Sequence, residues 1–152
     1  MKTSLQAPFS SYKIRKLGIN EKVKSFDCGD ADLNDFILNA STLYREALLA
    51  VTYVFEAEDD TTHEHIAAYF SLANDRVSMS DFPNKTEFNR FRKHRFVNEK
   101  RLKSYPAAKI CRLAINQELK GQHIGQFLIN FIKSFFLADN KTGCRFLTVD
   151  AY

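Results

Sequence analysis

The chain has 152 residues and a formal net charge of +4, with 45% hydrophobic and 26% charged residues, the composition of one soluble domain with its own core. No apolar run approaches the roughly 18 residues of a membrane span, and the N-terminus lacks the apolar segment of a secretory signal. Three cysteines at unrelated spacings fit reduced thiols in a cytoplasm better than disulfides or zinc, so we expect one cytoplasmic domain without a metal site.

The first third of the chain predicts a strand followed by a helix. Residues 12–17 alternate between polar and apolar side chains, as a half-buried strand does. The turn that follows ends at Asp30, a residue type that caps helix N-termini. Apolar residues at helical spacing then continue to about Leu49, with a break near Ser41 and Thr42.

The next stretch predicts an antiparallel hairpin. Residues 51–57 and 66–72 are rich in aromatic and β-branched side chains, and a polar turn at 59–63 separates them. Pro83 then interrupts the chain before a modest helix at 85–95, and Pro106 excludes helix from the following stretch.

Positive charge is concentrated between Lys85 and Lys103. This segment holds eight lysine or arginine residues against Glu87 and Glu99, so it carries +6 while the rest of the chain sums to −2. Such a patch suggests an anionic macromolecular partner, for which RNA is one candidate. A solvated connection that merely carries charge explains the same pattern, and both interpretations stay open.

The stretch from Lys109 to Gly125 predicts an anion site. An apolar strand at 110–115 leads through a polar loop at 116–122 into a helix at 125–138, whose apolar residues follow the spacing of one buried face. The first turn of a helix has unpaired N–H donors and a partial positive charge. Lys120, Gly121 and Gly125 add a charge and close backbone approach, so the loop is interpreted as a pyrophosphate cradle.

A last strand is predicted at 144–150. It follows the helix at 125–138, and a right-handed crossover would place it parallel to the strand at 110–115. The expected fold class is therefore α/β of the α+β type: a mixed, mostly antiparallel sheet flanked by helices, with a central parallel strand pair.

The loop resembles the coenzyme A loop of the GNAT superfamily of N-acetyltransferases, whose pattern is Arg or Gln, two residues, Gly, any residue, then Gly or Ala. Lys120 stands where the family has Arg or Gln, His123 stands where it has its first Gly, and Gly125 matches. Residues 112–115, Arg-Leu-Ala-Ile, look like the family's fourth strand, and residues 26–36 resemble the first helix start of the branch that includes acetyltransferase toxins of toxin–antitoxin pairs.

The resemblance implies acetyl-CoA as co-substrate and an amine as acceptor. The pantetheine arm would pair with exposed backbone at Leu113, Ala114 and Ile115, where a backbone N–H would also face the thioester oxygen. The pyrophosphate would be held by the loop residues Lys120, Gly121, Gln122, His123, Ile124 and Gly125. General acid and base remain unassigned, since capping explains the carboxylates near Asp30.

Three functions remain open. The first is direct acetyl transfer from acetyl-CoA to a primary amine. The second is a toxin that acetylates aminoacyl-tRNA, binds RNA through the segment from Lys85 to Lys103, and pairs with an antitoxin protein. The third is a catalytically weak module that binds coenzyme A or a protein partner through an open sheet edge.

Members of the family usually continue beyond the position of Tyr152 with another helix and two strands, which supply a tyrosine as general acid. The resemblance thus describes residues 1–152 as a single, C-terminally incomplete domain with reduced activity. An uncovered last strand would also favour a homodimer.

Overall fold

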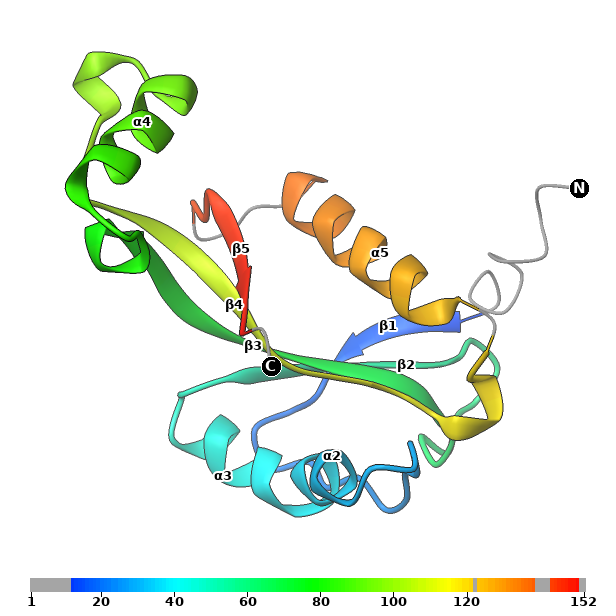
Figure 1. Ribbon diagram of the computed structural model, residues 1–152. Helices are drawn as coiled ribbons and strands as arrows, with labels where there is room; N and C mark the ends of the chain where they lie inside the picture. The colour runs from blue at the N-terminus through cyan, green and yellow to red at the C-terminus, as the bar shows by residue number, and fades with distance from the viewer. Residues whose placement is uncertain (1–11, 122, 139–142, 151–152) are drawn as a thin grey trace, which may run out of the picture.

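The computed structural model describes residues 12–121, 123–138 and 143–150 (Figure 1). Five strands form one sheet in chain order: β1 (Tyr12–Lys16), β2 (Val51–Ala57), β3 (Ile66–Ser78), β4 (Ser104–Ile115) and β5 (Phe146–Val149). The first four strands pair antiparallel, and β5 runs parallel to β4. The predicted mixed sheet with one parallel pair is confirmed.

Helices cover both faces of the sheet (Figure 1). Helix α5 (Ile124–Ala138) lies on one face and buries Ile124, Leu128 and Ile132 against Phe70 and its neighbours. The opposite face is covered by α2 (Ala31–Asp35), a π-helical turn at Phe36–Ala40 and α3 (Ser41–Glu46).

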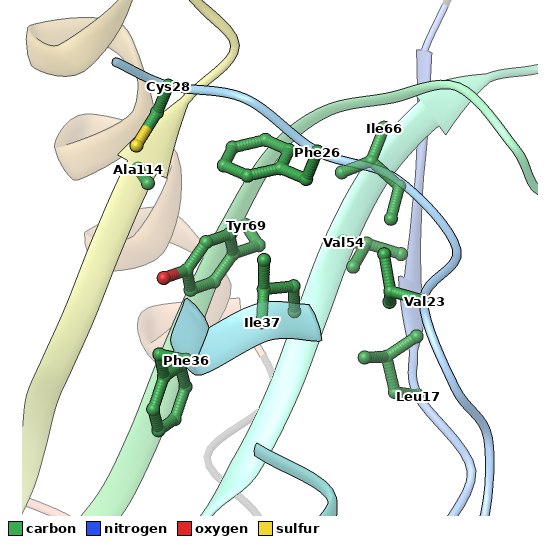
Figure 2. Close-up of a cluster of buried hydrophobic side chains, with 10 residues drawn as sticks. All are labelled: Leu17, Val23, Phe26, Cys28, Phe36, Ile37, Val54, Ile66, Tyr69 and Ala114. Atoms are coloured by element: carbon green, nitrogen blue, oxygen red, sulfur yellow. The ribbon is translucent and has the colours of Figure 1, made fainter. Parts of the chain in front are cut away.

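A second buried cluster fills the space between these helical turns and the sheet (Figure 2). Tyr69 lies at its centre, with its ring 5.3 Å from Phe26 and 6.1 Å from Phe36 between centroids. Its hydroxyl donates to the Leu33 carbonyl at 2.7 Å. Tyr69 is thus a buried structural residue that ties α2 to β3.

The helical region starts as the sequence predicts. The Asp30 carboxylate accepts the N–H groups of Asp32 and Leu33, at 2.9 and 3.1 Å, so its capping role is confirmed. The predicted break takes the form of the π-helical turn, after which α-helix resumes at Ser41. Arg45, 4% exposed, donates to the Gly18 carbonyl and the Ser41 hydroxyl and fixes α3 to the chain after β1.

Strands β3 and β4 are longer than the sequence patterns predict. The expected ends were Leu72 and Ile110, whereas their pairing continues to Ser78 and Ser104. The extended pair carries α4 (Lys85–Arg95) at its tip, so the two strands and α4 project together from the sheet (Figure 1). Aromatic contacts among Phe82, Phe88, Phe91, Phe96, Tyr105 and Phe146 stabilise this tip.

Short one-turn helices occupy the remaining connections: Met79–Asp81, Asn98–Lys100 and Gln117–Leu119. Cys28, Cys111 and Cys144 form no disulfide with one another. Within the described ranges, His, Cys, Asp and Glu side chains form no group that could hold a metal ion. None of the described helices is long and apolar enough to cross a bilayer.

Candidate functional site

Strand β5 pairs with only part of the outer edge of β4. Strand β5 pairs with residues 107–110, and its last partner on β4 is Ile110. Pairing with β3 on the other side continues to Ile115. Among the residues that the structure describes, no strand pairs with the outer edge of β4 from Cys111 to Ile115. This edge offers main-chain donors and acceptors to an extended ligand.

A bulge marks the point at which the outer pairing stops. Ser71 pairs with Arg112 and Leu72 with Ile110, which leaves Cys111 as the extra residue of β4. A bulge bends the strand and redirects its backbone groups, and bulges are frequent next to active sites. Burial raises the pKa of the Cys111 thiol, so the thiol is protonated near neutral pH and is a poor nucleophile.

The predicted strand contacts lie on this edge. Leu113 and Ile115 pack at the margin of the core beneath α5, and Ala114 is buried in the cluster on the opposite face. Their side chains therefore belong to the two cores, and contacts to a ligand would come from their main chain. The roles predicted for the three residues stay a prediction.

The strand leads within nine residues to the start of α5. Gly121 and His123 both adopt left-handed backbone conformations, with φ of +83° and +55°. His123 stands where the family pattern has glycine, and the positive φ gives the reason for that preference. Its carbonyl accepts the Phe127 N–H at 3.3 Å, so His123 precedes the first turn of α5. Ile124 is buried, and Gln122 lies outside the described residues.

The Lys120 side chain makes a contact outside this loop. Its ammonium donates to the Cys28 carbonyl, in the turn that precedes α2. The same turn receives Gln117, whose backbone N–H donates to the Asp27 carbonyl at 3.0 Å. The two segments that carry the family resemblance, 90 residues apart, are therefore in direct contact. Periodicity and motif spacing give no signal for such a contact.

A polar group beside the open edge was also missed by the sequence analysis. Lys109 Nζ lies 2.9 Å from Asp150 Oδ2, and this carboxylate raises the pKa of Lys109. The Thr148 hydroxyl donates to Asp75 and lowers the pKa of that carboxyl. Asp75 lies beyond the predicted end of its strand at Leu72, so only the observed register could bring it to Thr148.

Two cavities lie away from the predicted cofactor contacts. One of about 620 Å³ is lined by residues 24–27, 64–67 and 116–119, and one of about 450 Å³ lies beside Leu48, Leu49 and Phe135. Neither is lined by residues 113–115 or 120–125. The predicted contact surface is thus an open strand edge joined to a helix start.

The catalytic acid and base remain unassigned. Asp30 is engaged in capping. His63 Nδ1 lies 2.8 Å from Glu56, a fully buried carboxylate that also accepts from Arg15, so this histidine is engaged in a structural contact with Glu56. His65 lies beside the larger cavity.

No protein-family model matches the sequence. Solved structures do match the fold. AtaT complexed with acetyl-methionyl-tRNAfMet superposes with a TM-score of 0.67 at 20% identity, over 92% of this chain and 78% of the other. AtaTR bound with AcCoA gives 0.67 at 22% identity, over 93% and 78%. A KacT variant gives 0.66 at 22% identity, over 93% and 78%. The chain therefore shares the fold of the AtaT and KacT structures, in agreement with the GNAT-like fold expected from the sequence.

Proposed function

We propose that this chain is an acetyl-CoA-dependent N-acetyltransferase that transfers acetyl directly to a primary amine. The observation that carries the proposal is the outer edge of β4, unpaired from Cys111 to Ile115 within the described residues and leading to the start of α5. Acetyl-CoA has an extended amide-containing arm and a pyrophosphate. The arm suits a strand edge, and the pyrophosphate suits a helix N-terminus.

Direct acetyl transfer from a thioester needs little catalysis by side chains. A neutral amine attacks the thioester carbonyl, the C–N bond forms as the C–S bond breaks, coenzyme A leaves as thiolate, and the proton lost by the nitrogen passes to solvent or to that thiolate. A thiol has a pKa near 8.5, so thiolate departs at neutral pH without strong acid assistance. A backbone N–H of β4 near the bulge would stabilise the oxyanion, and proximity would supply much of the remaining rate.

Aminoacyl-tRNA is the acceptor that we favour. AtaT, which shares the fold, is known in complex with acetyl-methionyl-tRNAfMet. This chain presents the basic segment from Lys85 to Lys103 on a projecting tip, where four lysines at 85, 93, 100 and 103 are exposed. Exposed lysines on one projection suit phosphate contacts. The competing acceptor is a small amine, for which this segment would be irrelevant.

The similarity to AtaT also suggests a protein partner. The AtaT toxin is known bound to the C-terminus of the antitoxin AtaR and acetyl-CoA. We propose an antitoxin partner for this chain and a cytoplasmic location, where aminoacyl-tRNA and acetyl-CoA are both available. Self-association to a homodimer stays a prediction.

The decisive experiment measures thiol release from acetyl-CoA with methionyl-tRNA and with a panel of small amines, together with mass spectrometry of the acceptor. We expect acetylated aminoacyl-tRNA. Acetylation of small amines alone would leave the transferase and remove the tRNA acceptor. Binding of acetyl-CoA in calorimetry without any transfer would favour the third function, a binding module.

A further inference from the structure

We propose that Asp27 is a positioning residue for the loop that holds the pyrophosphate, an inference that rests on the proposed function. Asp27 lies in the turn that precedes α2 and contacts the loop through two groups, its side-chain carboxylate and its backbone carbonyl. Its Oδ2 accepts the Gln117 side-chain amide at 2.9 Å, and its carbonyl accepts the Gln117 backbone N–H at 3.0 Å. Both ends of the contact lie outside the predicted cofactor residues.

The turn around Asp27 is built to hold its shape. Phe26 and Cys28, on either side, are buried at 8% and 2% exposure in the cluster shown in Figure 2. Asp27 Oδ1 accepts the Gly29 N–H at 2.8 Å and the Asn34 side-chain amide at 3.1 Å. The Asn34 side-chain oxygen Oδ1 in turn accepts the Cys28 N–H at 2.9 Å. The turn therefore fixes the position of the Asp27 carboxylate that accepts the Gln117 amide.

The turn and the loop also approach closely at Gly29. This glycine has φ of +86°, and a Cβ placed on it would lie 3.4 Å from Gln117 Oε1 and 3.5 Å from Lys120 Nζ. The Lys120 ammonium donates to the neighbouring Cys28 carbonyl. Three points of the loop, the Gln117 backbone, the Gln117 side chain and Lys120, are thus fixed to the same turn.

These contacts have a consequence for binding. The loop continues from Lys120 directly into Gly121 and the first turn of α5, where the pyrophosphate donors are expected. A loop that is ordered before the ligand arrives pays less conformational entropy on binding. The side-chain hydrogen bond between Asp27 and Gln117 is exposed to solvent, so its effect lies in orientation, reinforced by the buried residues on either side of Asp27.

The test separates the pyrophosphate-containing nucleotide half of the cofactor from the thioester arm. Acetyl-pantetheine carries the same thioester and arm without the pyrophosphate and the adenosine attached to it. In Asp27→Ala we expect KM for acetyl-CoA to rise about tenfold while KM for acetyl-pantetheine and kcat stay unchanged. Asp32→Ala is the matched control, because Asp32 is an exposed carboxylate of the same helix start whose own backbone N–H is capped by Asp30.

A charge-conserving exchange tests the contact itself. Gln117→Glu places two carboxylates together, and combining it with Asp27→Asn restores a donor–acceptor pair without changing the net charge. We expect the double variant to regain most of the acetyl-CoA affinity that Gln117→Glu loses. Gln117→Ala serves if Asp27→Ala does not fold, because it removes the same side-chain contact from the side of the loop and keeps the Asp27 contacts to Gly29 and Asn34.

The outcomes are distinguishable. If the unmodified chain does not bind acetyl-CoA, the proposed function fails. If it binds but Asp27→Ala leaves KM for acetyl-CoA unchanged, the positioning role is overturned. An equal loss with acetyl-CoA and acetyl-pantetheine also overturns it, because it would show that Asp27 supports the fold in general.

Discussion

Gly125 faces Ile115 across the start of α5 with room for one methyl group. A Cβ placed on Gly125 would lie 3.6 Å from Ile115 Cδ1, an ordinary van der Waals contact. The family pattern allows Gly or Ala at this position, and the structure gives the reason. A longer side chain would add bulk beside Ile115 at the start of the helix, close to where the pyrophosphate is expected.

The first prediction concerns two substitutions of Gly125. Gly125→Ala should fold and retain acetyl-CoA affinity, whereas Gly125→Glu should abolish measurable binding, because its carboxylate would repel the phosphates and compete with them for the positive end of the helix dipole. Titration calorimetry checks both variants, with Gly125→Ala as the matched control for the loss of glycine. Unchanged affinity in Gly125→Glu would remove the site assignment.

Much of the fold could be predicted because local patterns agree with the sheet. The strand at 51–57 and the cap at Asp30 occur where the side-chain period and residue type place them. The patterns failed where strands extend beyond their apolar core. In β3, residues after Leu72 are largely polar, and their pairing depends on β4 and on the aromatic tip rather than on alternation.

The candidate site likewise has a part that the sequence predicts and a part that it does not. The strand, the loop and the start of α5 are contiguous in sequence, so a motif could mark them. The contact between Asp27 and Gln117 and the group of Asp75 with Thr148 join segments that are distant in sequence. Only tertiary register brings such residues together, and a single sequence carries no signal for it.

The second prediction concerns His123. Its φ of +55° is the left-handed region, which costs a non-glycine residue roughly 1 kcal/mol. His123→Gly should therefore leave the free energy of unfolding unchanged or raise it by up to about 1 kcal/mol, after the entropy cost of glycine. Urea unfolding measures the difference.

The control is the exposed His94 in α4, which has a helical backbone. His94→Gly should lower the free energy of unfolding by up to about 1 kcal/mol, because glycine is a poor helix former. Equal losses in the two variants would contradict the strain assigned to His123.

The third prediction concerns the buried Glu56. Its side chain is 0% exposed and its Oε1 lies 2.7 Å from Nε of Arg15, whose side chain is 24% exposed. Arg15→Ala should lower the free energy of unfolding by about 3 kcal/mol, since it leaves a buried carboxylate without its main partner. Adding Glu56→Gln should recover part of this loss, because the uncompensated charge is removed.

An exposed pair provides the comparison in the same denaturation experiment. Lys24 lies 3.3 Å from Glu64, with side chains 74% and 47% exposed. Lys24→Ala should cost less than about 1 kcal/mol. A loss in Arg15→Ala no larger than in Lys24→Ala would show that Glu56 does not depend on Arg15.

The last prediction concerns the basic tip. Its arginines are partly committed to the fold: Arg92 donates to the Leu102 carbonyl at 2.8 Å and stacks on Phe88, and Arg95 stacks on Phe91. Neutralising these arginines would confuse lost packing with lost charge. The exposed Lys85, Lys93 and Lys103 have no ion pair within the described ranges and report on charge alone.

The experiment measures tRNA binding against salt. Replacing Lys85, Lys93 and Lys103 by Gln should flatten the slope of log K against log salt by roughly one for each phosphate contact removed, and should leave acetyl-CoA affinity unchanged. The control replaces three exposed lysines outside the tip, Lys16, Lys22 and Lys133, with the same change in net charge. Because the two variants have the same net charge, long-range attraction to tRNA falls equally in both, so a flatter slope in the tip variant than in the control reports the phosphate contacts that the tip has lost. Equal slopes in the two variants would show that the tip is a solvated surface and that tRNA is held elsewhere.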